Sequence, residues 1–259
     1  MKVVILCGGQ GTRLREETEY KPKPMVEIGG RPILWHIMKR YAHYGFKEFV
    51  LCLGYKGDVI KDYFYHYGLH RGDATITLGK SHGVVFHDPH PEEGWKVTLA
   101  ETGENAMTGA RVKRAAKYLG REPFFLTYGD GLADIDLKEL LRFHKSHGKL
   151  GTVTGVHPPS RFGELLVKGD KVLTFSEKPQ THSGAINGGF FVFEHEFLNL
   201  LSDDDSCVLE QKPLEKLAAK GGLRVHSHQG FWQCMDTYRD FQFLNKLWDG
   251  GKAPWKTWA

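Results

Sequence analysis

Apolar runs alternate with amphipathic stretches through the first part of the chain. Val3–Leu6 and Phe49–Leu53 are continuous apolar runs, which are typical of strands buried on both faces. Between them, apolar residues recur with helical spacing from about Arg31 to just before Gly45, and a second, shorter helical pattern covers 59–64. The alternation predicts an α/β fold in which helices cover a parallel sheet and ligands bind at the carboxyl ends of the strands.

Residues 68–105 depart from this pattern. Thr75–Leu78, Val84–Phe86 and Lys96–Leu99 are short β-like runs separated by turn residues. We therefore predict an irregular β-rich insertion between the helical segments.

The α/β pattern then resumes and becomes more mixed. A helix that Thr108 is expected to cap precedes the buried run Phe124–Thr127, and a further helix is predicted over 136–147. A strand at 152–156 and a hairpin turning at Gly169-Asp170 follow. No Gly/Ser/Pro-rich linker divides the chain, so a single domain over 1–259 is predicted.

Composition narrows the classes of function. The chain has 259 residues, 41% of them hydrophobic, and a formal net charge of +4 with scattered Lys and Arg, so a nucleic-acid partner is not expected. No apolar run approaches the roughly 20 residues of a membrane span, and no signal peptide is recognised. Four cysteines without a C-x-x-C pair are typical of reduced thiols. These features predict a cytoplasmic protein without membrane contact.

A glycine-rich segment follows the first apolar run. In Gly8-Gly9-Gln10-Gly11-Thr12-Arg13 the glycines leave backbone N–H groups free to face phosphate oxygens, and Lys23 adds a second cation after Arg13. The spacing fits neither the P-loop nor the G-x-G-x-x-G pattern. A small phosphorylated ligand is expected, but not the site of a P-loop ATPase or a dehydrogenase.

Two aspartates are candidate metal ligands, because phosphate chemistry needs its negative charge neutralised. Asp130 follows the run Phe124–Thr127 and lies between two glycines, whereas Asp236 ends another apolar run and precedes a helical pattern. A turn residue at 130 is a less favoured alternative, whereas a helix N-cap at 236 fits the local sequence as well as a metal ligand does. Spacing alone does not bring the two carboxylates together.

A third cluster lies within 157–193, the expected sugar-binding part. Lys178 in Glu177-Lys178-Pro179 could meet a second phosphate, and Glu177 and Asn187 offer acceptors and donors suited to sugar hydroxyls. Taken alone, a loop lysine is more often simply solvated.

With these motifs in place, the chain resembles the sugar-1-phosphate nucleotidyltransferases over essentially its whole length. The resemblance rests on Gly8–Leu14, Lys21–Val26, Thr127–Gly131, Glu177–Pro179, Asn187–Phe191 and Gly230–Gln233. Met107–Arg111 and Ala253–Trp258 are similar to the cytidylyl branch of that family.

The resemblance implies a Rossmann-like fold with a mixed, mainly parallel sheet, and it also implies a reaction. In it, CMP passes from CTP to α-D-glucose 1-phosphate, with Mg²⁺ as cofactor, giving CDP-glucose and pyrophosphate. The residues implied to bind nucleotide are Leu6, Cys7, Gly8, Gly9, Gln10, Gly11, Thr12, Arg13, Lys23, Ala106, Arg111 and Gly129.

The same resemblance implies the remaining roles. Arg13, Lys23 and Lys178 are the implied catalytic cations, and Asp130 and Asp236 the implied Mg²⁺ ligands. The sugar is expected at Glu177, Lys178, Asn187 and Gly188. A homo-oligomer is expected as well, and some relatives are hexamers.

Two other functions remain compatible with the sequence. A UDP- or dTDP-sugar pyrophosphorylase would keep the mechanism and change the base, since base choice depends on a few hydrogen bonds. A nucleotide-binding regulatory subunit would keep the fold and lose turnover.

Overall fold

A mixed eight-stranded sheet forms the centre of the computed structural model, which describes residues 1–79, 83–87, 92, 94–157, 164–168, 171–176 and 185–258. The strand order is β13-β10-β14-β8-β1-β4-β7, with β15 also paired to β10. These strands are β1 (Val3–Leu6), β4 (Glu48–Leu53), β7 (Lys96–Glu101), β8 (Phe124–Tyr128), β10 (Gly151–Val156), β13 (Ile186–Asn187), β14 (Phe191–Phe193) and β15 (Leu223–His228).

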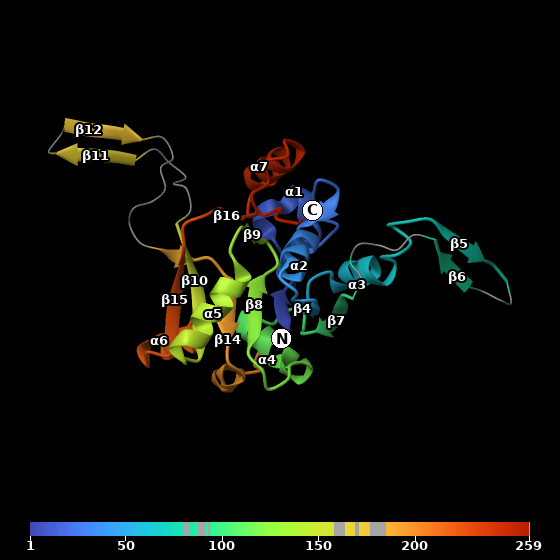
Figure 1. The fold of residues 1–259 in the computed structure, drawn as a ribbon, viewed down its shortest axis with the longest axis horizontal. Coiled ribbons are helices and arrows are strands. Elements are labelled where there is room, and N and C mark those ends of the chain that lie inside the picture. Colours follow the sequence, from blue (N-terminus) through green and yellow to red (C-terminus); the bar gives the residue numbers. More distant parts are fainter. Residues whose placement is uncertain are drawn as a thin grey trace.

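Most of the strand pairs in this sheet are parallel. β7, β4, β1 and β8 run parallel to one another, whereas β14 is antiparallel to both β8 and β10 (Figure 1). The predicted α/β class with a mixed, mainly parallel sheet is confirmed.

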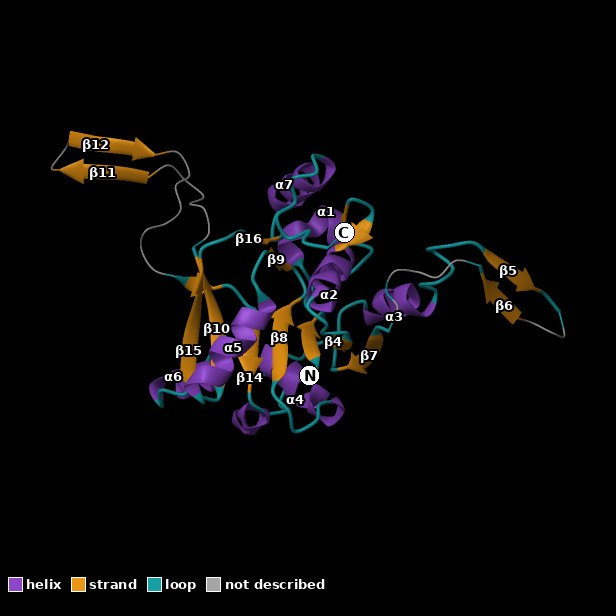
Figure 2. Ribbon diagram, viewed as in Figure 1, coloured by secondary structure: helices purple, strands orange, loops and turns teal. Residues whose placement is uncertain are grey.

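Helices cover both faces of the sheet (Figure 2). Val3 and Ile5 of β1 pack with α2 (Ile33–His43) and α5 (Leu137–His147), while Val4 and Leu6 pack with α4 (Thr108–Ala115) and α6 (Lys212–Ala219) on the other face. Strand side chains alternate between faces, so one apolar run supplies two cores. The other helices are α1 (Arg15–Thr18), α3 (Gly57–Tyr65) and α7 (Tyr238–Asp249), with 3₁₀ turns η1 (Thr12–Leu14), η2 (Lys23–Met25), η3 (Ala116–Tyr118) and η4 (His195–Leu200).

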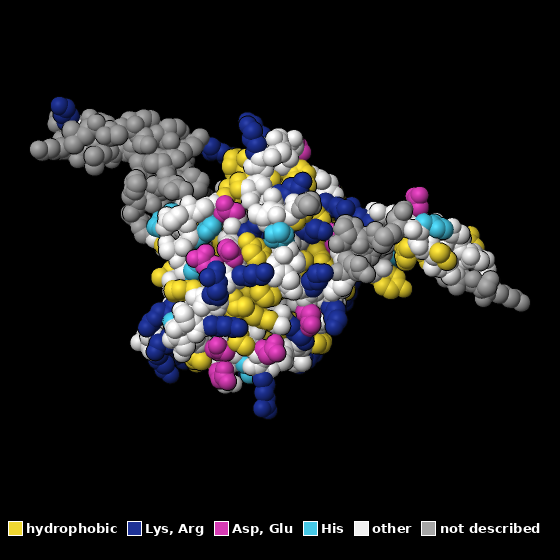
Figure 3. Space-filling view, viewed as in Figure 1, with side chains coloured by type: hydrophobic (Ala, Val, Ile, Leu, Met, Phe, Trp, Pro, Cys, Tyr) yellow, Lys and Arg dark blue, Asp and Glu magenta, His cyan; other side chains and the backbone are white. Residues whose placement is uncertain are grey.

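The region predicted as a β-rich insertion divides into two parts. β5 (Ala74–Thr77) and β6 (Gly83–Phe86) form a hairpin outside the main sheet, which extends from the body of the molecule (Figures 1 and 3). Lys96–Leu99, expected in the insertion, instead belong to β7 and pair in parallel with β4. The sequence pattern groups this run with the insertion because turn residues separate three short β-like runs there, and its partly polar sequence fits its position as an edge strand.

Three more small sheets complete the fold. β2 (Glu27–Ile28) pairs with β3 (Arg31–Pro32), β9 (Gly131–Ala133) with β16 (Trp232–Cys234), and β11 (Glu164–Lys168) with β12 (Lys171–Ser176). β11 and β12 form the predicted hairpin, whose turn residues Gly169 and Asp170 lie outside the described residues. Among the described residues, no helix has the length and apolar character needed to span a bilayer.

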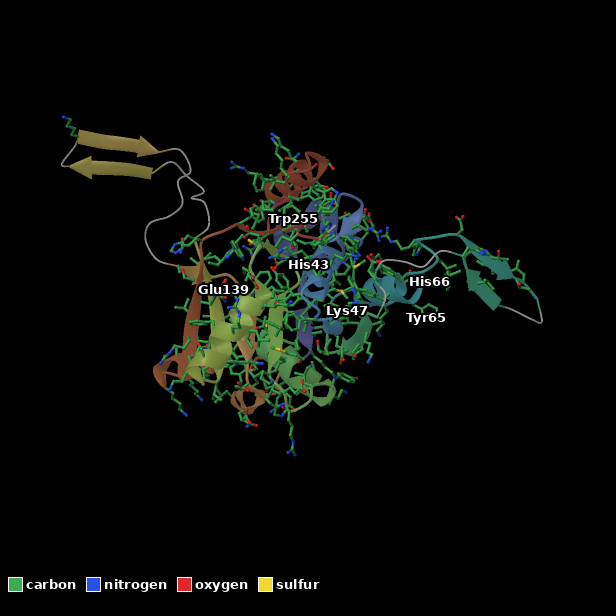
Figure 4. All side chains as sticks on the ribbon, viewed as in Figure 1. His43, Lys47, Tyr65, His66, Glu139 and Trp255 are labelled. Carbon is green, nitrogen blue, oxygen red and sulfur yellow. The ribbon has the colours of Figure 1, made fainter. Side chains whose placement is uncertain are left out.

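The C-terminal segment returns to the core after α7. Trp255, labelled in Figure 4, is fully buried and stacks with Phe231 and Trp248. Its indole N–H donates to His36 Nδ1 of α2 at 3.4 Å. The end of the chain therefore helps to fix α2 against the sheet.

Candidate active site

A cleft of about 320 Å³ opens at the carboxyl ends of β1 and β8, a size within the usual range of small-molecule sites. The cleft lies between the segments that follow β1 and β8, the start of α4 and the turn η2. The lining residues are Leu6, Cys7, Gly8, Gly9, Gly11, Thr12, Arg13, Lys23, Pro24, Ala106, Met107, Thr108, Arg111, Tyr128, Gly129 and Asp130. The position at the strand ends is the one predicted from the alternating pattern.

The glycine loop presents unused donors to this cleft. In the part of the chain that the structure describes, no hydrogen bond uses the backbone N–H groups from Gly8 to Gly11. Gly11 has φ +64°, and a Cβ there would meet Thr18 Cγ2 at 3.0 Å and Lys23 Cβ at 3.1 Å. The loop conformation thus favours glycine and leaves its amides available to an anion.

Lys23 and two carboxylates meet at one end of the cleft. Lys23 Nζ lies 2.6 Å from Asp130 Oδ2 and 2.5 Å from Asp236 Oδ1, and Arg13 lies 3.0 Å from Asp236 Oδ2. Lys23 is only 9% exposed. A buried charge needs paired partners, and here two cations and two anions supply them for each other.

The β9–β16 ladder explains how Asp130 and Asp236 come together. Cys234 pairs with Gly131, and Met235 N–H donates to the carbonyl of Asp130 at 2.9 Å. The antiparallel ladder therefore places the residue before β9 beside the residues after β16.

Asp236 is not the helix cap. Thr237 caps α7 in a capping box with Asp240, so the Asp236 carboxylate is left to face Lys23 and Arg13.

The opposite charges in this cluster stabilise one another. Burial alone would lower the pKa of Lys23, but the charges and hydrogen bonds of Asp130 and Asp236 raise that pKa above its ordinary value. Burial would raise the pKa of Asp236, yet Lys23 and then Arg13 bring it below its ordinary value. Lys23 and Asp236 are consequently both charged near neutral pH.

Arg111 occupies a different environment in the same cleft. Its side chain is buried (4% exposed), and its terminal nitrogens donate only to neutral groups. These are the carbonyls of Gly8, Leu53, Gly103 and Glu104 and the hydroxyl of Thr102, at 2.7 to 3.1 Å. A Cβ on Gly8 would meet Arg111 at 2.1 Å. Arg111 therefore holds three loops together around the cleft.

The other predicted binding residues are distributed unevenly. Gln10 lines a second hollow with Thr12, Thr18, Glu19 and Tyr55. Asn187 and Gly188 lie beside the cleft, where Asn187 Nδ2 donates to the Tyr128 hydroxyl at 3.2 Å and Gly188 accepts from Trp232 Nε1 at 2.8 Å. Glu177 and Lys178 lie outside the described residues.

Comparison with known proteins decides the family. The family model for nucleotidyl transferase matches residues 2–233. The chain belongs to the nucleotidyl transferase family. It is 53% identical over 259 residues to glucose-1-phosphate cytidylyltransferase of Salmonella typhimurium, and the match covers the whole of both chains.

Solved structures share the fold of this nucleotidyl transferase. HddC from Yersinia pseudotuberculosis has a TM-score of 0.67 at 25% identity, with 95% of this chain and 99% of that chain covered. The inositol-1-phosphate CTP transferase from T. maritima has a TM-score of 0.63 at 17% identity and covers 96% of each chain. The second likeness shows that the fold is shared.

In and beside the nucleotidyl transferase cleft lie residues to which the sequence reasoning gave no role in the site. Tyr128, Met107, Thr108 and Pro24 line it, and Glu210 accepts hydrogen bonds from Tyr128 and Thr108. The first four lie inside the motifs that carried the family resemblance. Glu210 lies in no recognisable motif, and nothing in the sequence pattern could have found it.

Proposed function

We propose that this nucleotidyl transferase transfers CMP from CTP to α-D-glucose 1-phosphate, forming CDP-glucose and releasing pyrophosphate. The observation that carries the proposal is the 53% identity to a glucose-1-phosphate cytidylyltransferase, in an alignment that covers all of both chains. The cleft supports it, since free backbone donors and two cations lie at the same strand ends.

The nucleotide would bind with its phosphates toward the glycine loop. The amides from Gly8 to Gly11 would donate to phosphate oxygens, and Arg13 and Lys23 would neutralise the charge that develops on the departing pyrophosphate. Arg13 is well suited to this role because its side chain is 70% exposed and can turn toward a ligand. Leu6, Cys7, Thr12, Ala106 and Gly129 would complete the walls.

Asp130 and Asp236 fit a magnesium ion. Mg²⁺ is usually held by one or two carboxylates together with substrate phosphates, and these two carboxylates already converge on one cationic atom, Lys23 Nζ. In the described part of the chain, no three His, Cys, Asp or Glu side chains converge to hold a metal unaided. When bound, Mg²⁺ would neutralise phosphate charge, and Lys23 would be released toward the triphosphate.

The chemistry needs no protein base. The attacking oxygen belongs to the sugar phosphate, which is already an anion near neutral pH, so alignment and charge neutralisation account for the rate. Lys178 is proposed to anchor that phosphate, with Glu177, Asn187 and Gly188 at the hexose.

Pyrophosphate release tests the proposal directly. Purified protein with Mg²⁺ and glucose 1-phosphate would be given CTP, UTP, dTTP, ATP and GTP in separate reactions. Release with CTP alone is the expected result. Release with UTP or dTTP would instead indicate a different base specificity, and no release with any nucleotide would favour a regulatory nucleotide-binding subunit.

We also propose that the protein assembles with copies of itself through the β5–β6 hairpin. This projecting hairpin and its edge expose apolar side chains, among them Leu78 (81%), Val85 (60%) and Phe86 (52%) (Figure 3), more than a free surface usually carries. Sedimentation should show an oligomer, a hexamer by the family resemblance, that Val85→Glu converts to smaller species. A monomer at all concentrations would contradict the proposal.

A cytoplasmic location is proposed on the state of the cysteines. Cys7, Cys52, Cys207 and Cys234 are free thiols, which suits a reducing compartment.

A further inference from the structure

The segment from Asp205 to Glu210 is docked on the beginning of α4. Met107 N–H donates to the Asp205 carbonyl at 2.9 Å, and the N–H groups of Gly109 and Ala110 donate to the Cys207 carbonyl at 2.9 and 3.1 Å. A Cβ on Gly109 would lie 2.7 Å from Cys207 Sγ. The backbone that carries Glu210 is therefore held in place, and the first donors of α4 are already used.

The Glu210 carboxylate then accepts two hydrogen bonds from residues of the cleft wall. The Tyr128 hydroxyl donates to Oε1 at 2.6 Å, and the Thr108 hydroxyl donates to Oε2 at 2.7 Å. Thr108 was expected to cap α4, but its oxygen accepts from Leu209 N–H at 2.9 Å instead. Each hydroxyl is thus oriented by the docked segment.

Asn187 extends this chain of hydrogen bonds to the proposed sugar side. Its Oδ1 accepts from Gly189 N–H at 2.9 Å, which fixes the amide so that Nδ2 faces the Tyr128 hydroxyl at 3.2 Å. Tyr128 has one proton, which goes to Glu210, so it can only accept from Asn187.

We infer that Glu210 is a positioning residue for the acceptor sugar, acting through Tyr128 on Asn187. Because Glu210 accepts the hydrogen bond of the Tyr128 hydroxyl, the phenol oxygen presents an acceptor lone pair beside the remaining N–H donor of Asn187. A sugar hydroxyl, which both donates and accepts, is complementary to that pair. The inference rests on the proposed function only in taking a hexose phosphate as the acceptor.

Glu210→Gln tests the inference, with Glu215→Gln as its matched control. The amide keeps the shape of Glu210 but can no longer accept from both hydroxyls. Glu215 lies in α6, is exposed, and is free of side-chain hydrogen bonds and ion pairs in the described structure. Glu210→Gln should raise the KM for glucose 1-phosphate about five- to tenfold, the loss of one ordinary hydrogen bond. The KM for CTP, kcat and Tm should stay near those of the control.

A double-mutant cycle separates positioning from general loosening. In a Tyr128→Phe background the phenol is absent, so Glu210→Gln should raise the sugar KM by less than about twofold. A sugar KM equal to that of Glu215→Gln, or a full effect that persists with Tyr128→Phe, would overturn the inference.

Calorimetric binding of glucose 1-phosphate keeps the two proposals distinguishable. A parent protein without turnover would refute the proposed function. Weaker binding of the sugar phosphate by Glu210→Gln than by Glu215→Gln would still support the positioning role, and equal binding would refute it.

Discussion

Lys23 and Arg111 are two buried cations in one cleft, and their surroundings differ in kind. Lys23 contacts two carboxylates, Asp130 and Asp236, at 2.6 and 2.5 Å. Arg111 donates to four backbone carbonyls and one hydroxyl. These five neutral acceptors take the place of the carboxylate that usually accompanies a buried arginine.

The difference indicates which end of the cleft can change. If a metal–nucleotide complex binds as proposed, the two carboxylates can accept a divalent cation in place of the ammonium, and the Lys23 contacts would then be remodelled. The carbonyls around Arg111 belong to the loops that form the cleft, and they cannot leave without opening it. The end of the cleft at Lys23 is therefore suited to binding charged groups, whereas the end at Arg111 stabilises the shape of the cleft.

The largest effect is expected from Asp130→Asn. If Asp130 holds the metal, the amide should reduce turnover about a thousandfold, because the phosphate charge is then poorly neutralised. Pyrophosphate release over a Mg²⁺ titration measures it, and Asp203→Asn in an exposed loop is the control. Near-normal release at every Mg²⁺ concentration would remove the metal assignment and with it the contrast between the two ends.

Lys23→Met should lower turnover about a hundredfold and also change the response to metal alone. Without the ammonium, Asp130 loses its cationic partner and Asp236 keeps only Arg13, so Mg²⁺ should raise the Tm of the variant more than that of the parent protein. Differential scanning calorimetry without nucleotide measures the shift. Lys21→Met, two residues away, should behave as the parent does, and equal shifts in Lys23→Met would show that Lys23 and metal do not share partners.

Arg111→Met should act on stability, independently of Mg²⁺. Removing the guanidinium takes a donor from four carbonyls, and among the described residues those of Gly103 and Glu104 have no other hydrogen-bond donor. The loss should lower the free energy of unfolding by about 3 kcal/mol. Urea unfolding with and without Mg²⁺ gives the value, and exposed Arg142→Met is the control. A destabilisation that Mg²⁺ reverses would make Arg111 part of the end that binds charged groups instead.

Sequence reasoning reached the first half of the fold and most of the cleft. The runs Val3–Leu6, Phe49–Leu53 and Phe124–Thr127 are long and apolar, so their burial and strand character follow from composition alone. The glycine loop could be placed because it directly follows such a strand. The sequence predicts a strand at Lys96–Leu99 but places it in the insertion, because turn residues separate it from two other short runs and its pairing with β4 is not visible in the sequence.

Long-range pairing could not be predicted. Asp130 and Asp236 are 106 positions apart in the chain, and the β9–β16 ladder brings them together. The partners of Glu210 depend likewise on how 205–210 docks on α4. Local patterns report which elements form, but contacts between distant segments depend on tertiary packing that a single sequence does not display.

His36 extends the comparison to a buried group that avoids charge altogether. Nε2–H donates to the Ile28 carbonyl at 2.8 Å, and Nδ1 accepts from Trp255, so the geometry requires a neutral ring. Burial lowers the pKa of His36 to about 4. Lys23 is stabilised by anions and Arg111 by dipoles, whereas His36 has only the neutral state available.

The smallest effect is therefore a pH dependence of stability. Below pH 6.5 the unfolded chain protonates His36 while the folded protein keeps it neutral, so stability present above that pH is lost as the pH falls toward 4. Between pH 7 and pH 5 the loss from this residue should be about 2 kcal/mol. Urea unfolding of the parent protein and of His36→Gln at both pH values isolates the contribution of His36 to the free energy of unfolding, because all other titratable groups are the same in both proteins. The variant should lose less stability than the parent on acidification, and equal losses would mean that His36 becomes protonated inside the fold.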